Sequence, residues 1–304
     1  FFCNSEKMES ADDWWNLEPK LGKRPSPART TKSPESKVVE AFRVESQEKL
    51  RRASETWSAK RNANSDGDER FMDQMLRSGT LADRIAAMTL RVQQSPLHEL
   101  SSLDGLLKLG QKGNHRGSRL AFEALCDLFK ENLLPADRQL IALESRPLLS
   151  SEATEEHKLM WGFEAELKAR FSLFLDQLSL ALKDSTTDLR RIGLDCAADL
   201  LTHRSEQEGT LMSLVVNKLG DPDRKIASRA VLKLQQLLQK HPNMTKVVVQ
   251  YTKGLLGRKN LQPRATYNAI VFLNQVRLVR GDSELADVLV TTYLGLFDTA
   301  TKSG

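Results

Sequence analysis

From residue 69 onward, hydrophobic positions recur every three or four residues, which is the spacing of one face of an α-helix. Met72, Met75 and Leu76 begin this pattern, and Pro96 ends the second helix that it predicts. The run of valines within residues 246–251 is the single candidate strand, and it has no second strand to pair with. We therefore expect an all-α chain. Later helices are predicted over residues 97–109, 118–132, 137–144, 155–183, 187–203, 207–219, 223–240, 243–256, 261–279 and 283–297.

The second half of the chain contains an internal repeat. Residues 182–184 correspond to residues 219–221 at a spacing of 37, and the apolar positions that follow keep the same spacing. These apolar pairs are Leu189 and Ile226, Leu194 and Val231, Ala197 and Leu234, and Leu200 and Leu237. A weaker third copy follows after 39 residues. Two-helix units of about 40 residues are typical of HEAT arrays, so the sequence predicts an α-solenoid of HEAT-like helix pairs.

The region before this array has a different composition. Residues 1–36 are rich in Lys, Pro and Ser without any period, which predicts a disordered polar and basic tail. A charged helix and linker are expected over residues 37–68, and the solenoid over residues 69–304. Trp14 and Trp15 are an exception within the tail, because two adjacent indoles are costly to leave in water. We expect them to dock on this folded body or on a partner.

Composition excludes several classes of protein. No apolar run approaches the roughly 18–20 residues that span a bilayer, so no membrane partner is expected. The three cysteines lie far apart, which fits a reducing compartment, and Cys126 and Cys196 are expected to be buried, inert thiols. The chain begins at Phe1 instead of Met, so we interpret it as a fragment.

The sequence contains no catalytic or metal-binding pattern. The five histidines occur singly, without a His-Glu-x-x-His pair, and are expected at the surface. Gly110, Gly113 and Gly117 form a glycine-rich loop, but no Gly-Lys-Ser/Thr follows it and no strand is predicted before it. We therefore predict no enzymatic activity, no cofactor and no small-molecule substrate.

Positive charge is concentrated in one stretch of the chain. Residues 217–280 contain 13 Lys or Arg and 2 Asp or Glu, although the net charge of the whole chain is +5. Such an asymmetry indicates a polyanionic partner. Because the turns of a solenoid align along one edge, these cations are expected to form a phosphate-binding surface. The candidate RNA-binding residues are Lys218, Arg224, Lys225, Arg229, Lys233, Lys253, Arg258, Lys259 and Arg264.

A structural alternative stays open for the same stretch. Asp221 and Pro222 are typical of a helix start, where Asp221 accepts a hydrogen bond from a free backbone N–H and Pro222 lacks a donor that is not needed. In this alternative the cations on the following helix form a solvated face, and Arg229 binds Asp221 and Asp184 within the repeat.

Several long motifs resemble one protein family. They occupy residues 206–208, 214–228, 236–244 and 272–275, preceded in the same order by residues 78–84, 94–96 and 132–138. Over residues 69–297 the chain is similar to the CCAAT-binding factor domain of the nucleolar complex protein one / CCAAT/enhancer-binding protein zeta family. The turn at residues 185–188 departs from the His-Asp-Pro sequence usual in that family.

The resemblance implies an all-helical, non-enzymatic assembly factor for early precursors of the large ribosomal subunit. It implies a location in the nucleus and nucleolus, with precursor ribosomal RNA, a nucleolar complex protein two-like assembly factor and the pre-large-subunit particle as partners. It also implies that the array is C-terminally incomplete in this chain. With an obligate protein partner implied, an apolar surface is expected within residues 97–148, and burial in the array is the alternative. Its candidate residues are Leu125, Leu128, Phe129, Leu133 and Leu134.

Two other functions stay open. A protein-only HEAT scaffold in transport or signalling is the first, because fold alone does not decide function. A CCAAT-box-linked transcription regulator is the second, although the sequence shows no helix-turn-helix, zinc finger or basic zipper for base readout. The aromatic residues of the basic stretch, Tyr251, Tyr267 and Phe272, are too few for a stacking platform, so contacts with RNA backbone and shape are expected.

Overall fold

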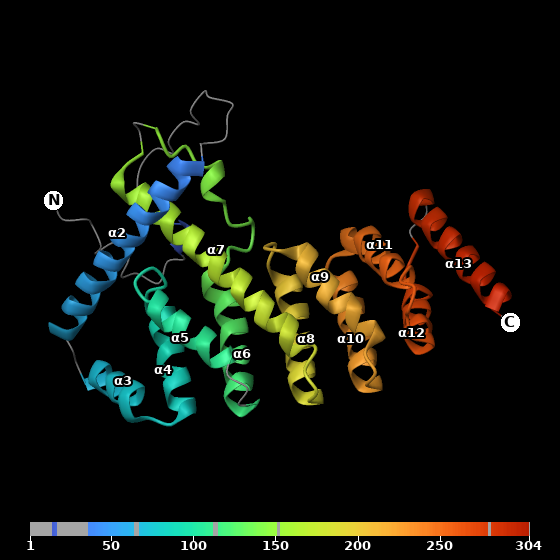
Figure 1. The fold of residues 1–304 in the computed structure, drawn as a ribbon, viewed down its shortest axis with the longest axis horizontal. Coiled ribbons are helices and arrows are strands. Elements are labelled where there is room, and N and C mark those ends of the chain that lie inside the picture. The colour runs from blue at the N-terminus through green and yellow to red at the C-terminus, as the bar shows by residue number, and fades with distance from the viewer. Residues whose placement is uncertain are drawn as a thin grey trace. The chain divides into compact units, whose positions relative to one another are not determined.

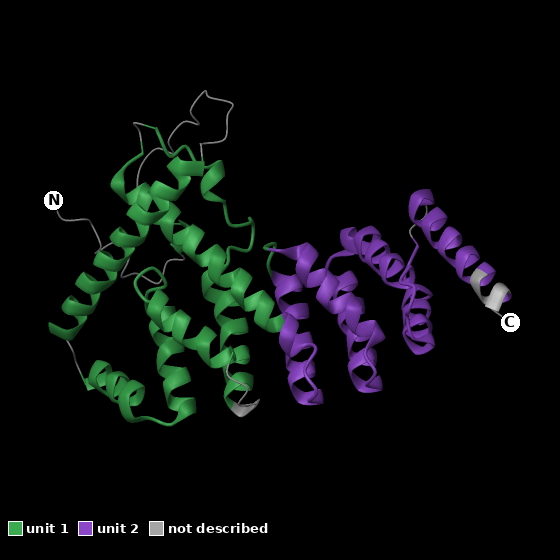
Figure 2. Cartoon of the chain, in the orientation of Figure 1, with its two compact units in different colours: residues 1–178, 204–206 green, residues 179–203, 207–304 purple. Residues whose placement is uncertain are grey.

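The computed structural model describes residues 14–16, 36–63, 67–111, 115–150, 153–278 and 281–303, and every regular element in these ranges is helical (Figure 1). The predicted all-α class is confirmed. The chain divides into two compact units (Figure 2). Unit 1 comprises Phe1–Leu178 and Arg204–Glu206, and unit 2 comprises Ser179–His203 and Gln207–Gly304. Most of the tail predicted over residues 1–36 lies outside the described residues.

Unit 1 contains helices that pack in chain order. Neighbouring helices from α3 to α6 contact one another, and α4 also contacts α6. A short π-helix, Phe129–Leu133, continues α6, and a 3-10 turn, Leu143–Ser145, precedes α7. The helices of this unit are α2 (Ser36–Ala63), α3 (Gly67–Ser78), α4 (Leu81–Gln94), α5 (Leu100–Gln111), α6 (His115–Leu128) and most of α7 (Glu155–Ala181).

Helix α2 is a packed part of unit 1. Val39 and Phe42 on one of its faces form a core cluster with Trp161 of α7 and with Leu143 and Leu148 from the segment before α7. The rings of Phe42 and Trp161 lie 6.4 Å apart. The expected division into residues 37–68 and 69–304 does not coincide with the compact units, because this cluster joins α2 to α7.

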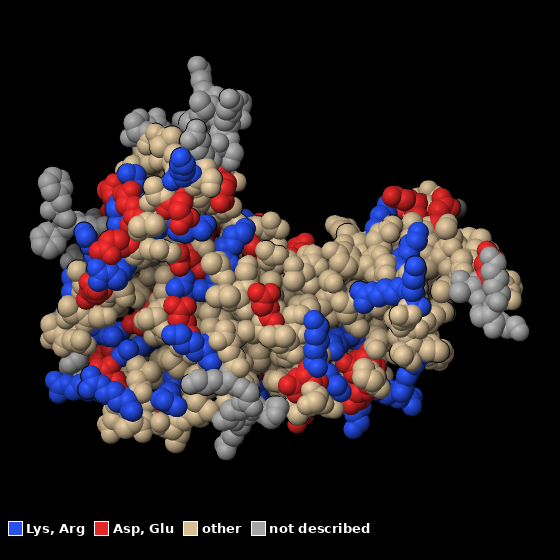
Figure 3. All heavy atoms as spheres, viewed as in Figure 1, with Lys and Arg blue, Asp and Glu red and all other residues tan. Residues whose placement is uncertain are grey.

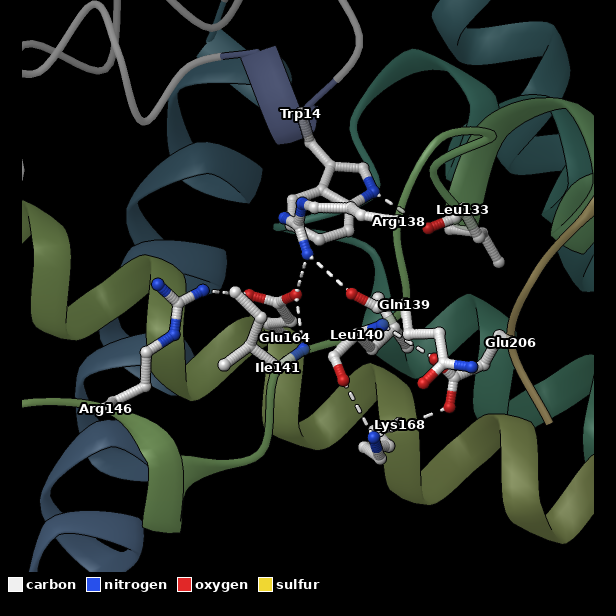
Figure 4. A network of polar contacts seen from close by, with 10 residues as sticks. All are labelled: Trp14, Leu133, Arg138, Gln139, Leu140, Ile141, Arg146, Glu164, Lys168 and Glu206. Carbon is white, nitrogen blue, oxygen red and sulfur yellow. Dashed lines mark hydrogen bonds and ion pairs between the residues drawn. The ribbon is translucent and has the colours of Figure 1, made fainter.

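Residues 137–144 do not form the predicted helix, and that prediction is wrong. The backbone of this segment forms hydrogen bonds with carboxylates of distant residues instead (Figure 4). The N–H of Leu140 donates to a carboxylate oxygen of Glu206 at 2.6 Å, and the N–H of Ile141 donates to Glu164 at 2.9 Å. Because these carboxylates replace the carbonyl acceptors of a helix, the segment satisfies its backbone in a non-helical conformation.

Unit 2 confirms the predicted repeat. Helices α8 and α10 begin 37 residues apart, at Thr187 and Arg224, and α12 begins 39 residues after α10, at Pro263. Helix α10 contacts α8 and α12, and α11 contacts α9, α12 and α13, so helix pairs stack in the manner of a solenoid. Two 3-10 turns, η5 (Lys218–Gly220) and η6 (Pro242–Met244), connect them. The helices are α8 (Thr187–His203), α9 (Glu208–Asn217), α10 (Arg224–Lys240), α11 (Thr245–Leu256), α12 (Pro263–Leu273) and α13 (Ser283–Ser303).

The burial of the cysteines and histidines agrees only in part with the predictions from the sequence. Cys126 and Cys196 are buried, as predicted. His98 and His157 are also buried, so the expectation that all histidines lie at the surface is wrong. Hydroxyl groups explain this, because Ser95 Oγ lies 2.7 Å from Nδ1 of His98 and Thr154 Oγ1 lies 2.6 Å from Nδ1 of His157. The hydroxyl contact satisfies one ring nitrogen of each histidine, whereas the buried Nε2 of His157 has no hydrogen-bond partner among the described residues.

His98 makes the stability of unit 1 sensitive to pH. Its ring stacks on Trp57 of α2 with centroids 4.8 Å apart, and burial lowers the pKa of His98 to about 4, against a smaller opposing effect of Glu99. The unfolded chain therefore binds more protons than the folded chain between about pH 4 and pH 6.5. Stability from this group is present above pH 6.5 and is lost as the pH falls.

We expect the free energy of unfolding to decrease by up to about 3 kcal/mol as the pH is lowered from about 6.5 to about 4. Urea titrations at several pH values measure this decrease. The His98→Gln variant removes the titrating group, so its free energy of unfolding should decrease less over the same range. Equal pH dependence of the variant and the wild type would contradict the assignment to His98.

Candidate nucleic-acid interface

The turns before α10 and before α12 lie side by side in unit 2. The turn η5 packs on α12, and Nδ2 of Asn268 on α12 donates to the carbonyl of Leu219 in η5 at 3.0 Å. A guanidinium nitrogen of Arg258, after α11, donates to Oδ1 of Asn217 at the end of α9 at 2.7 Å. The two turns therefore form one edge of this unit, as the repeat predicts.

Six of the candidate cations belong to this edge or to the helix turn that leads into it. Each is exposed. Within the described part of the chain, no carboxylate forms an ion pair with any of them, and Arg258 alone bonds a neutral side chain, that of Asn217. We call this set the basic edge: Arg224, Lys225, Lys253, Arg258, Lys259 and Arg264.

Helix α10 begins at Arg224 because Asp223 caps it. The Asp223 carboxylate accepts a 2.8 Å hydrogen bond from the N–H of Lys225, and this bond lowers the pKa of Asp223. The helix start predicted at Asp221 and Pro222 is therefore displaced by two residues. Asp221 is buried and accepts the N–H of Asp223 at 2.9 Å, so the hydrogen bond predicted for Asp221 is confirmed.

Lys218 is held inside the repeat. Its Nζ donates to Oδ2 of Asp221 at 2.8 Å and to the Leu182 carbonyl, and its side chain is 13% exposed. Arg190 of α8 lies 3.6 Å from the same carboxylate. Lys218 and Arg190, and not Arg229, are thus the cations that pair with Asp221.

Arg229 and Lys233 of α10 pair with carboxylates of α8. Arg229 donates to both oxygens of Asp195 at 2.6 and 2.8 Å, which raises the pKa of Arg229. Lys233 donates to Asp199 at 2.7 Å. Figure 3 shows acidic and basic side chains intermixed over this part of unit 2. The prediction that Arg229 pairs with Asp221 and Asp184 is wrong, because α8 presents Asp195 to it.

Sequence reasoning missed Asp195 and Asp199 as partners of the basic stretch. Each acid lies 34 residues before its cation. The repeat spacing is 37 residues, so each acid lies three residues, or about one helical turn, beyond the position on α8 that is equivalent to its cation on α10. The shared i, i+4 spacing of the two acids and of the two cations was the available signal. The total charge of residues 217–280 does not reveal this spacing, because both acids lie outside that stretch.

One aromatic ring is available near the basic edge. Tyr267 of α12 is 67% exposed, whereas Phe272 is buried and Tyr251 is half-buried. A single exposed ring agrees with the expectation that this region lacks a stacking platform like that of single-strand binders.

The candidate partner-binding residues of unit 1 are in its core. Leu125, Leu128, Phe129, Leu133 and Leu134 each have 0% exposure. The ring of Phe129 lies 5.0 Å from that of Phe171 and 5.2 Å from that of Phe174, both on α7. The expectation that these residues form an exposed apolar surface is therefore corrected, since all five are buried in unit 1, which was the alternative.

The described residues include neither a metal-binding cluster nor a membrane-spanning helix. No group of three or more His, Cys, Asp or Glu side chains in these ranges is arranged to hold a metal ion. None of the helices described combines the length and the apolar character needed to cross a membrane.

Comparison with known proteins finds relatives over most of the chain. It is 34% identical over 274 residues, 87% of its length, to CCAAT/enhancer-binding protein zeta of Mus musculus. It is 35% identical over 255 residues to the Ribosome biogenesis protein NOC1 of Chaetomium thermophilum, and 30% identical over 309 residues to Nucleolar complex protein 1 of Drosophila melanogaster. The chain belongs to the family of these proteins.

The match covers most of this chain but only part of the length of its relatives. The chain spans about a quarter of the length of these relatives, from 24% to 26%. No protein-family model matches the chain. The resemblance read from the sequence motifs is nevertheless confirmed, because the same family is found independently over 77% to 98% of the chain.

Proposed function

We propose that this chain is part of a non-catalytic assembly factor for early precursors of the large ribosomal subunit, and that its basic edge binds precursor ribosomal RNA. Two relatives carry names that refer to ribosome biogenesis and to a nucleolar complex, which supports a place in the nucleus and nucleolus. The observation that carries the RNA assignment is a row of exposed cations on one edge of unit 2 without carboxylate partners among the described residues.

The proposed contact is with phosphates. Cations that carry no ion pair can neutralise phosphates and release counterions, whereas Lys218, Arg229 and Lys233 would first have to leave their carboxylates. A helical edge with one exposed aromatic ring suits backbone and shape recognition of folded RNA better than base readout. We therefore assign binding to the basic edge and not to all nine cations predicted from the sequence.

A protein partner is the second part of the proposal. The partner is a nucleolar complex protein two-like assembly factor within the pre-large-subunit particle. Val290, Leu294 and Phe297 support a protein contact, because these large apolar side chains are more than half exposed at i, i+4 and i+7 on α13. The same observation favours the alternative function, a protein-only scaffold in transport or signalling.

Salt-dependent RNA binding tests the first part. Replacing Lys225, Lys259 and Arg264 together by Ala should reduce the slope of log affinity against log salt by up to about three and weaken binding to all structured RNAs alike. The matched control replaces three exposed cations of unit 1, Arg77, Arg84 and Lys108, and should leave the slope near its wild-type value.

A further variant separates the two groups of cations. Lys233→Ala removes a lysine already paired with Asp199, so it should change the slope less than any one substitution in the basic edge. An unchanged affinity and slope in the folded triple variant would refute RNA binding at this edge. Crosslinking that recovers cargo proteins and no precursor ribosomal RNA would favour the protein-only scaffold.

A further inference from the structure

The short element Trp14–Asn16 of unit 1 buries one side chain in the fold. Trp14 is its one buried residue, with 4% exposure. The indole Nε1–H donates a 2.9 Å hydrogen bond to the Leu133 carbonyl, at the end of the π-helical turn (Figure 4). The indole meets Phe163 of α7 edge to face, with ring centroids 5.1 Å apart at 83°. The guanidinium of Arg138 lies 5.9 Å from the indole centroid.

We call Leu133, Arg138 and Phe163 the Trp14 site. Contacts other than those with Trp14 hold this site in place. Arg138 donates to the buried carboxylate of Glu164 and to the Gln139 carbonyl, and Glu164 also binds Arg146 (Figure 4). Leu133 ends the π-helical turn after α6 and Phe163 belongs to α7, so regular elements of unit 1 set both positions. Such a site is preorganised, which lowers the entropic cost of binding.

The three contacts together select tryptophan. The Leu133 carbonyl requires an N–H donor on the ring, which phenylalanine lacks. The Arg138 cation is attracted to the face of an indole more strongly than to other aromatic rings. The edge-to-face geometry with Phe163 adds a contact that no aliphatic side chain can make.

We propose that the Trp14 site is a recognition site for a short peptide with a tryptophan anchor, and that the chain's own Trp14 segment is its tethered occupant. Trp14 is the buried anchor side chain of this segment, as a tryptophan is in a linear motif. A tryptophan-bearing segment of a partner protein has the same chemistry and competes with the tether. This inference stands apart from RNA binding, because every contact lies in unit 1.

Peptide binding to the full chain tests the proposal. The probe is a fluorescein-labelled peptide of residues 9–19, and fluorescence polarisation measures its affinity for the wild type and for Trp14→Ala. The chain's own Trp14 competes with the peptide at an effective concentration on the order of millimolar, so the peptide should bind Trp14→Ala at least about tenfold more tightly than the wild type. The same peptide with Trp14→Ala should bind neither chain.

Two further variants complete the experiment. Tyr267→Ala removes an exposed aromatic ring from unit 2 and should bind the peptide as weakly as the wild type. Trp14→Phe keeps a ring in the site without the N–H donor and should give an intermediate affinity. Equal peptide affinity of folded Trp14→Ala and wild type overturns the proposal. If circular dichroism shows that Trp14→Ala is unfolded, equal affinity of Trp14→Phe and wild type overturns it.

Discussion

Replacing Glu164 by Ala is expected to lower the free energy of unfolding by about 3–5 kcal/mol, because removing one partner of a buried ion pair leaves uncompensated charge. Glu164 of α7 is 2% exposed and binds two cations, Arg138 and Arg146, the second of them with a side chain only 9% exposed. Its carboxylate also accepts the N–H of Ile141 at 2.9 Å. Urea denaturation followed by circular dichroism measures the change.

A second carboxylate on the same helix provides the control. Glu155 pairs with Lys49 and Lys158, but its side chain is 68% exposed. Surface pairs of this kind contribute about 0–1 kcal/mol, so Glu155→Ala should change the free energy of unfolding by no more than that. If Glu155→Ala and Glu164→Ala destabilise the chain equally, the buried network does not hold the segment between α6 and α7.

Replacing Phe129 by Ala is also expected to lower the free energy of unfolding by about 3–5 kcal/mol, as for other large aromatic side chains removed from cores. Phe129 has 0% exposure and packs against Phe171 and Phe174, so truncation leaves a cavity in unit 1. The same measurement distinguishes the two roles considered for this residue. A side chain that formed only a partner surface would leave the isolated chain as stable as before.

An exposed phenylalanine in the same unit is the matched control. Phe71 of α3 is 62% exposed, and Phe71→Ala should change the free energy of unfolding by less than about 0.5 kcal/mol. A small effect of Phe129→Ala, similar to that of Phe71→Ala, would show that α7 does not cover the residue in solution.

The candidate interface was predictable only in part. The stretch of 13 cations is visible in the sequence, and the repeat correctly predicts that the turns before α10 and α12 share an edge. The sequence does not reveal that Asp195 and Asp199 pair with Arg229 and Lys233, because the partners come from another helix. The usable surface is therefore smaller than the charge count suggested.

The sequence by itself determined the helical class and the 37-residue repeat, and it predicted that the N-terminal tryptophans dock, either on this fold or on a partner. Apolar spacing and repeated positions are properties of a local pattern. Exposing an indole ring to water is unfavourable wherever the tryptophan lies in the chain.

Only the tertiary structure decided which polar groups are satisfied inside the fold. Residues 137–144 are not helical because Glu164 and Glu206 bind their backbone, and His98 is buried because Trp57 and Ser95 contact its ring. Glu164, Glu206 and Trp57 are distant in the chain from the groups that they contact, whereas Ser95 is three residues from His98. Their energies depend on burial and distance, which become defined only when the helices pack.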